Sequence, residues 1–252
     1  VYTLAEIGNL IHGLPELVRV KETFPGAEVT AVRHRPDPLE AMNRRVFAFN
    51  DALDEAVLAP VARGYARVVS APVRHGVGNV FANPLDVGSA INLFLQGRPI
   101  DGLSDLARFG INSTVGVFGI FDPATPWGMP RHGEDFGQTL GKWGAGPGAY
   151  VVWPLLGPSA LRDSLAMPVD YVTSPRFELA ATPLQITQTR SSLLSASSVL
   201  DAVALDRYLF VRDFYLQRRQ SLVYDGHPPA SPSANADAGS FSSSNPQVPQ
   251  DE

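Results

Sequence analysis

The residues best suited to chemistry lie in the stretch RHGEDFG (131–137), which groups His132, Glu134 and Asp135. A metal site or an acid–base pair would need partners from elsewhere in the chain, and no second cluster has the required spacing. The five histidines of the chain also lack the spacing of metal ligands. We therefore expect a solvated loop at 131–137, and no metal site.

Two glycine-rich stretches invite comparison with nucleotide-binding loops. GQTLGKWG (137–144) fails as a phosphate loop because Gly137 and Gly141 are too close and Trp143 occupies the Ser/Thr position. GAGPG (144–148) follows no strand and has a proline where a helix should open. It predicts a rigid structural turn made by Gly144, Gly146, Pro147 and Gly148.

Serine chemistry is not indicated either. SSLLSASS (191–198) is rich in serine but contains no G-x-S-x-G nucleophile elbow. The chain of 252 residues has no cysteine, which removes thiol nucleophiles and cysteine-bound zinc. We predict no catalytic residues and no cofactor. The net charge of −5, without a basic stripe, also argues against nucleic-acid binding.

The stretch RFGINSTVGVFGIFDP (108–123) carries no charge between Phe109 and Phe121. As a helix it would be about 20 Å long, too short for a bilayer core of about 30 Å. Two interpretations remain open at this point: a buried central hairpin in a soluble bundle, or a helical hairpin whose apolar end dips into lipid.

Proline-initiated helices indicate the fold class. DPLE (37–40), NPLD (83–86), SPRFE (174–178) and TPLQ (182–185) each combine a capping side chain with proline at the first helical position. Apolar stripes with helical spacing run from Leu39 to Val57, ending before Pro60, and from Leu200 to Leu222. A helix is also expected over 3–20, interrupted near Pro15, and YVVW (150–153) is expected as an extended loop rather than a short strand. The prediction is an all-α protein.

Composition marks residues 226–252 as a disordered tail rich in proline and serine. Before this tail, two helices spanning 76–99 and 100–123 are expected to meet at a Gly-Arg-Pro turn.

Several motifs together resemble the MlaA/VacJ family of Gram-negative outer-membrane lipoproteins. The matching stretches, in order, are DPLEAMNRRVFAFND (37–51), NLFLQGRP (92–99), RFGINSTVGVFGIFDPA (108–124), EDFGQTLGKWGAGPGAYVVWPLLGPSALRD (134–163) and RYLFVRDFYLQRR (207–219).

The matching stretches cover about 37–225, so the resemblance implies a helical domain over these residues and leaves 1–36 as an N-terminal helical extension. The resemblance also implies a ring-like bundle of amphipathic helices, embedded in the periplasmic leaflet of the outer membrane, with an amphipathic central channel. It implies removal of misplaced phospholipid from the outer leaflet. The implied partners are phospholipid, the membrane, a porin trimer and a periplasmic lipid carrier, and no catalysis is implied.

The resemblance also suggests roles for particular side chains. Phe47, Phe49 and Asn50 become candidates for the channel and its gating, although core packing would equally explain Phe49. The candidates for membrane embedding are Ile91, Leu93, Phe94, Leu95, Phe109, Ile111, Val115, Phe118, Ile120 and Phe121. An apolar helix face lying in one leaflet needs to reach only about 5–10 Å deep.

One departure and two alternatives stay open. Family members carry an acylated cysteine, which this sequence does not contain, so anchoring would rely on a trimmed segment or on the embedded helices. The first alternative is a membrane scaffold that organises porins without conducting lipid. The second is a phospholipase that uses His132 with a serine or with Asp135.

Overall fold

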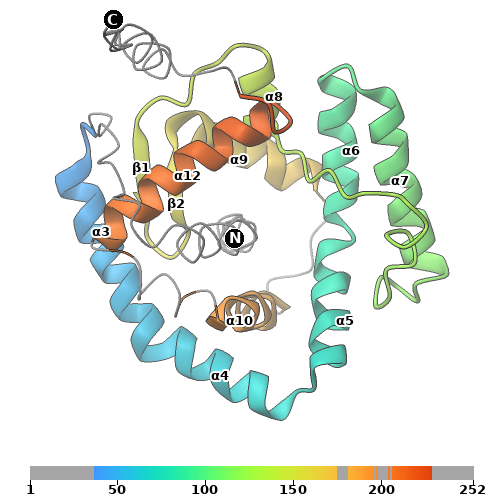
Figure 1. The fold of residues 1–252 in the computed structure, drawn as a ribbon, viewed down its shortest axis with the longest axis horizontal. Helices are drawn as coiled ribbons and strands as arrows, with labels where there is room; N and C mark the ends of the chain where they lie inside the picture. The colour runs from blue at the N-terminus through green and yellow to red at the C-terminus, as the bar shows by residue number, and fades with distance from the viewer. Residues whose placement is uncertain (1–36, 175–180, 196, 198–203, 205, 229–252) are drawn as a thin grey trace, which may run out of the picture.

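The computed structural model describes residues 37–174, 181–195, 197, 204 and 206–228 (Figure 1). The predicted helix over 3–20, the extension at 1–36, the helix start after Ser174 and all but three residues of the predicted tail lie outside the described residues.

Helices dominate the described chain, which confirms the all-α prediction. The elements are α3 (Glu40–Leu53), η1 (Asp54–Leu58), α4 (Ala59–Val68), α5 (Ala71–Ala82), α6 (Leu85–Leu95), α7 (Pro99–Thr114), α8 (Phe136–Lys142), β1 (Tyr150–Trp153), β2 (Gly157–Ala160), α9 (Leu161–Thr173), α10 (Thr182–Ser192) and α12 (Arg207–Val223). They follow a ring-like outline in Figure 1, with α7 outside α6 and α10 inside the corner between α4 and α5.

Proline lies within two residues of the start of α3, α6 and α10, as predicted, but the predicted caps are wrong: the N-cap residues are Leu39, Pro84 and Ala181, and none of the three helices has a side-chain cap hydrogen bond. At the first of these, the Asp37 carboxylate accepts the Leu39 N–H at 3.0 Å. The helical hairpin is also confirmed: α6 and α7 are joined by Gln96, Gly97 and Arg98, and Gly97 has φ 77°.

The first long helix was predicted to end before Pro60, and this prediction is wrong. Its backbone stays helical from Glu40 to Val68, passing from α3 through the π-helical segment η1 into α4. Proline lacks the N–H that an α-helical turn needs, and a wider π turn just before it accommodates the missing bond.

The stretch YVVW is a strand and not a loop. β1 pairs antiparallel with β2, with Tyr150 opposite Ala160 and Trp153 opposite Gly157. The other edge of β1 is bonded by a buried side chain of α3, because Asn43 Nδ2 donates to Tyr150 O and Asn43 Oδ1 accepts from Val152 N, both at 2.9 Å. A strand of four residues flanked by proline carries too little alternation to be recognised in sequence.

The main hydrophobic core lies between α3, the β-hairpin of β1 and β2, and α12. It is built on Tyr150, Val152, Ala160, Tyr208 and Tyr215, all nearly inaccessible. Phe47 packs against this core, edge-on to Tyr208 with ring centroids 5.8 Å apart. The predicted α12 stripe is confirmed at Tyr208, Val211 and Tyr215, which are buried. Its predicted start is not: Ala204 precedes the helix, and Leu200 lies outside the described residues.

Candidate functional site

The described residues show an inverted distribution of polarity. The largest fully buried side chains are mostly polar or charged, and include Arg108, Arg212, Gln138, Asn43 and Asn112. Large apolar side chains are exposed along most elements, among them Phe49, Val68, Val73, Phe94, Ile100, Leu103, Phe118, Phe121, Leu165 and Val172. Single exposed apolar residues are ordinary on protein surfaces, but their combination with a polar interior is not.

Helix α7 shows the inversion most clearly. Its buried residues are Gly102, Asp105, Arg108 and Asn112, whereas Ile100, Leu103 and Leu106 are exposed. The helix ends at Thr114, and residues 115–120 form consecutive turns, so the predicted helix to Phe121 is wrong. These turns require glycine at 116 and 119, because neither position has room for a Cβ and Gly119 has φ 83°.

The stretch after α7 is not a buried core segment. Val115, Phe118, Ile120 and Phe121 are 42–82% exposed, which excludes the soluble-bundle interpretation for these four side chains. The other two candidates from this stretch, Phe109 and Ile111, are half-buried.

The candidates on α6 divide in the same way. Phe94 and Leu95 are exposed, and Ile91 is half-buried. Leu93 is fully buried and cannot face lipid, so its assignment as an embedding residue is wrong. On a helix that is apolar nearly all round, one face must pack against the protein, and the sequence alone does not identify that face.

The three channel candidates lie on α3 but differ in their surroundings. Phe47 is partly buried against Tyr208, whereas Phe49 is 54% exposed, so core packing does not explain Phe49. Asn50 lies two turns after Asn43 and, like Asn43, forms hydrogen bonds with the main chain of the β1–β2 hairpin. Its Nδ2 donates to Trp153 O and its Oδ1 accepts from Leu155 N, both at 2.9 Å.

The predicted structural turn follows α8. Gly144 and Gly148 have φ of 96° and 70°, a conformation that favours glycine. Gly146 would have open space around a Cβ. The carbonyl of Pro147 accepts the Arg162 N–H at 3.1 Å, which ties the turn to the start of α9.

Arg131 and Gly133 are exposed, but the second half of the 131–137 stretch is a buried junction of charges, where the prediction of a solvated loop is wrong. Glu134 and Asp135 are 8% and 6% exposed. Asp135 receives a bidentate pair from Arg219 of α12 at 2.5 and 2.9 Å, and Arg219 also contacts Asp163 at 2.9 Å. Burial alone would raise the pKa of Asp135, but the ion pair with Arg219 outweighs it and lowers that pKa.

Arg219 is a residue that sequence reasoning misplaced. Its position near the helix end suggested an exposed C-terminal cation. However, it lies four residues after buried Tyr215, and this spacing continues the buried stripe of α12.

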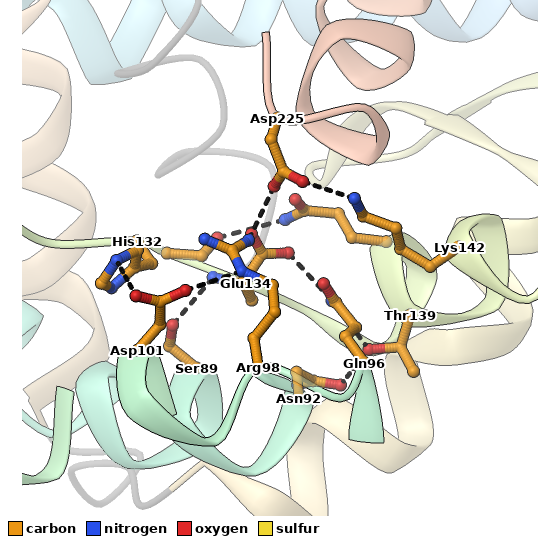
Figure 2. Close-up of polar contacts among 12 residues, drawn as sticks. Ser89, Asn92, Gln96, Arg98, Asp101, His132, Glu134, Thr139, Lys142 and Asp225 are labelled. Carbon is orange, nitrogen blue, oxygen red and sulfur yellow. Dashed lines mark hydrogen bonds and ion pairs between the residues drawn. The ribbon is translucent and has the colours of Figure 1, made fainter. Parts of the chain in front are cut away.

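A second set of polar contacts joins the turn between α6 and α7 to α8 and to the end of α12 (Figure 2). Arg98 Nη1 contacts Asp225 at 2.7 Å and Glu134 at 3.5 Å, and Lys142 also pairs with Asp225. Gln96 donates to Glu134 at 3.0 Å and to Thr139 at 3.1 Å. Burial raises the pKa of Glu134, against the opposing hydrogen bond from Gln96.

The geometry around His132 does not support nucleophile activation. Its Nδ1 lies 2.8 Å from Asp105, and Ser89 donates to the other oxygen of Asp105 at 2.6 Å. Asp105 therefore lies between the serine and the histidine, whereas a nucleophile needs the histidine between them. Among the described residues, no group of His, Cys, Asp and Glu could hold a metal ion.

Fold and surface together define a class: helical proteins that bury many paired charged and polar side chains and expose many large apolar ones. Within the part of the chain that the structure describes, no helix is both long and apolar enough to cross a membrane. The model of the MlaA lipoprotein family matches residues 35–222, and the chain belongs to this family.

Individual relatives agree with this assignment. The chain is 33% identical over 215 residues to the intermembrane phospholipid transport system lipoprotein MlaA of Escherichia coli (strain K12), covering 80% of this chain and 85% of that protein. It is 33% identical over 206 residues to an uncharacterized protein of Rickettsia bellii, covering 78% and 80%. A solved structure described as the structural basis for maintenance of bacterial outer membrane lipid asymmetry is similar at TM-score 0.67 and 34% identity, covering 75% of this chain and all of that one.

Proposed function

We propose that this protein is the outer-membrane component of a phospholipid trafficking system. It lies in the periplasmic leaflet, takes mislocalised phospholipid from the outer leaflet and passes it to a periplasmic lipid carrier, in association with a porin trimer. The inverted polarity carries the proposal, because an apolar exterior with internally paired charges is stable in lipid. The names of the relatives supply the transported class, phospholipid.

In this proposal the ring of helices surrounds an amphipathic channel. Phe47, Phe49 and Asn50 act at the channel side of α3, next to the hairpin that Asn50 bonds. Deleting Phe49 would rotate the following helix by about 100° and break the two-turn spacing of Asn43 and Asn50. We expect the deletion to change lipid flux, whereas the point change Asn50→Ala weakens only the hairpin contact.

Complementation tests the proposal. Cells lacking their own MlaA would receive this chain with a lipoprotein signal, and outer-leaflet phospholipid would be measured with a membrane-impermeant phospholipase. We expect the chain to lower that phospholipid, and Phe118→Asp with Phe121→Asp to abolish the effect. Gln217→Asp, at an exposed polar position of α12, is the matched control.

Two outcomes would replace the proposal. A chain that co-purifies with porin trimers but moves no phospholipid would be a scaffold. Lyso-lipid production that is lost in His132→Ala would indicate a phospholipase.

A further inference from the structure

The segment after α7 has an unusual backbone. Val117 and Phe118 have φ of 51° and 57°, in the left-handed region, followed by Gly119 at 83°. The left-handed conformation costs a non-glycine residue roughly 1–2 kcal/mol, and it is a rare outlier for a β-branched valine. Such a conformation persists only where surrounding contacts impose it, and it is frequent at functional sites.

The main-chain N–H groups of this segment are satisfied within the segment and the last turn of α7. Each of the six successive N–H groups from Gly116 to Phe121 donates to a main-chain carbonyl within 111–117, at 2.8–3.2 Å. The carbonyl of Ile120 accepts from Asn79 of α5 at 3.1 Å. Irregular backbone exposed to water has no need to pair every N–H group within the protein, whereas backbone exposed to hydrocarbon requires it.

Two polar side chains hold the segment in place. Asn112, which is 1% exposed, donates to Asp122 at 2.9 Å and accepts from Ala124 N at 3.2 Å. Asp122 also accepts from Thr125 Oγ1 at 2.7 Å and from Arg108 at 3.0 Å. Partial burial would raise the pKa of Asp122, but the hydrogen bonds from Thr125, Asn112 and Arg108 lower it to about 2.

The surface of residues 115–121 is therefore uncharged, although paired charged side chains lie beside it. The side chains that remain exposed are all large and apolar: Val115, Val117, Phe118, Ile120 and Phe121. The nearest charges along the chain, Arg108 and Asp122, are paired with each other. An uncharged apolar surface of this kind contacts lipid acyl chains more favourably than it contacts water or a polar protein surface.

We propose that Asn112 and Asp122 are positioning residues that hold 115–121 as a preformed wedge in the acyl-chain region of the leaflet. The inference rests on the proposed function, because it needs the protein to lie in a membrane. Beyond that function, the inference identifies residues 115–121 as the segment that reaches the acyl chains, and Asn112 and Asp122 as the residues that fix its conformation.

Depth quenching tests the wedge. Because the chain has no cysteine, Phe118→Cys can carry a single environment-sensitive fluorophore, and Gln217→Cys on α12 provides the matched control. Vesicles of phosphatidylethanolamine and phosphatidylglycerol with brominated acyl chains are the quencher. We expect strong quenching at 118, none at 217, and loss of quenching at 118 when Asp122→Asn is added.

The control for folding is circular dichroism and thermal unfolding of every variant. If Asp122→Asn does not fold, Thr125→Val, which removes a hydrogen bond from the exposed side of Asp122, replaces it in the same comparison. Quenching at 118 that is unchanged in a folded Asp122 or Thr125 variant would overturn the positioning role.

The outcomes also separate the inference from the proposed function. A protein that binds the vesicles while position 118 stays unquenched would overturn the wedge and leave the proposed function standing. A folded protein that does not bind vesicles at all would overturn both.

Discussion

Asp86 and Asp122 flank the same buried guanidinium, yet their pKa values shift in opposite directions. Arg108 lies 3.4 Å from Asp86 and 3.0 Å from Asp122. Asp86 is almost inaccessible, and burial raises its pKa to about 6 against the opposing effect of Arg131 and Arg108. Asp122 receives more hydrogen bonds and is less buried, so its pKa falls to about 2. Burial and hydrogen bonding, more than the shared partner Arg108, decide whether the pKa of each carboxyl is raised or lowered.

Asp86→Asn tests this difference. A carboxyl whose folded pKa is raised stabilises the protein below its unfolded pKa, near 3.8, and loses that contribution as pH rises through about 6. The free energy of unfolding of the wild type, minus that of Asp86→Asn, should therefore fall between pH 4 and 7. At about 1.4 kcal/mol per pKa unit, the fall is at most about 3 kcal/mol. Urea unfolding across pH measures it, and a constant difference would contradict the account.

Arg219→Leu tests the ion-pair junction of α12. The change leaves Asp135 and Asp163 buried without their shared cation, and we expect a loss of about 3–5 kcal/mol in the free energy of unfolding. Arg45→Leu, on the exposed side of α3, is the matched control and should change stability by less than about 0.5 kcal/mol. Equal urea midpoints for the two variants would show that Arg219 is not structural.

At the scale of elements, close approach of α6 and α9 depends on one glycine. A Cβ at Gly88 would lie 2.1 Å from Ser174 Oγ and 3.1 Å from Ser174 Cβ. Gly88→Ala should therefore cost about 1–3 kcal/mol through overpacking. Gly64→Ala in α4 meets no atom within 4 Å and should stabilise its helix by up to about 1 kcal/mol. Thermal unfolding compares the two, and a stabilising Gly88→Ala would refute the packing described.

The elements predicted correctly from sequence are those with local signals. Proline marks the starts of α3 and α6, although the side chains predicted to cap them do not, and spacing marks the buried stripe of α12. The prediction failed where long-range contacts decide. Nothing local to 131–137 indicates that Arg219 will bury it, and nothing in Val117 or Phe118 announces a left-handed backbone.

The sequence also does not indicate whether the apolar face of a helix is buried or exposed. The stripe on α3 is visible in sequence, but periodicity does not distinguish a face that packs on protein from one that stays exposed. Phe49 and Met42, on that stripe, are exposed, and the fully buried side chain of α3 is Asn43. In a protein with inverted polarity, the polar residue on a helix is the better indicator of its inner face.

For the whole molecule, the central claim is that the exterior of this helical ring meets lipid. The most direct measurement is flotation of the chain with phospholipid vesicles at low and high salt, with bound phospholipid assayed in the same fractions. Apolar insertion is insensitive to salt, whereas attachment through surface charge is screened. We predict that the protein floats at both salt concentrations and retains phospholipid. A folded, monodisperse chain that stays at the bottom of the gradient without lipid would contradict the claim.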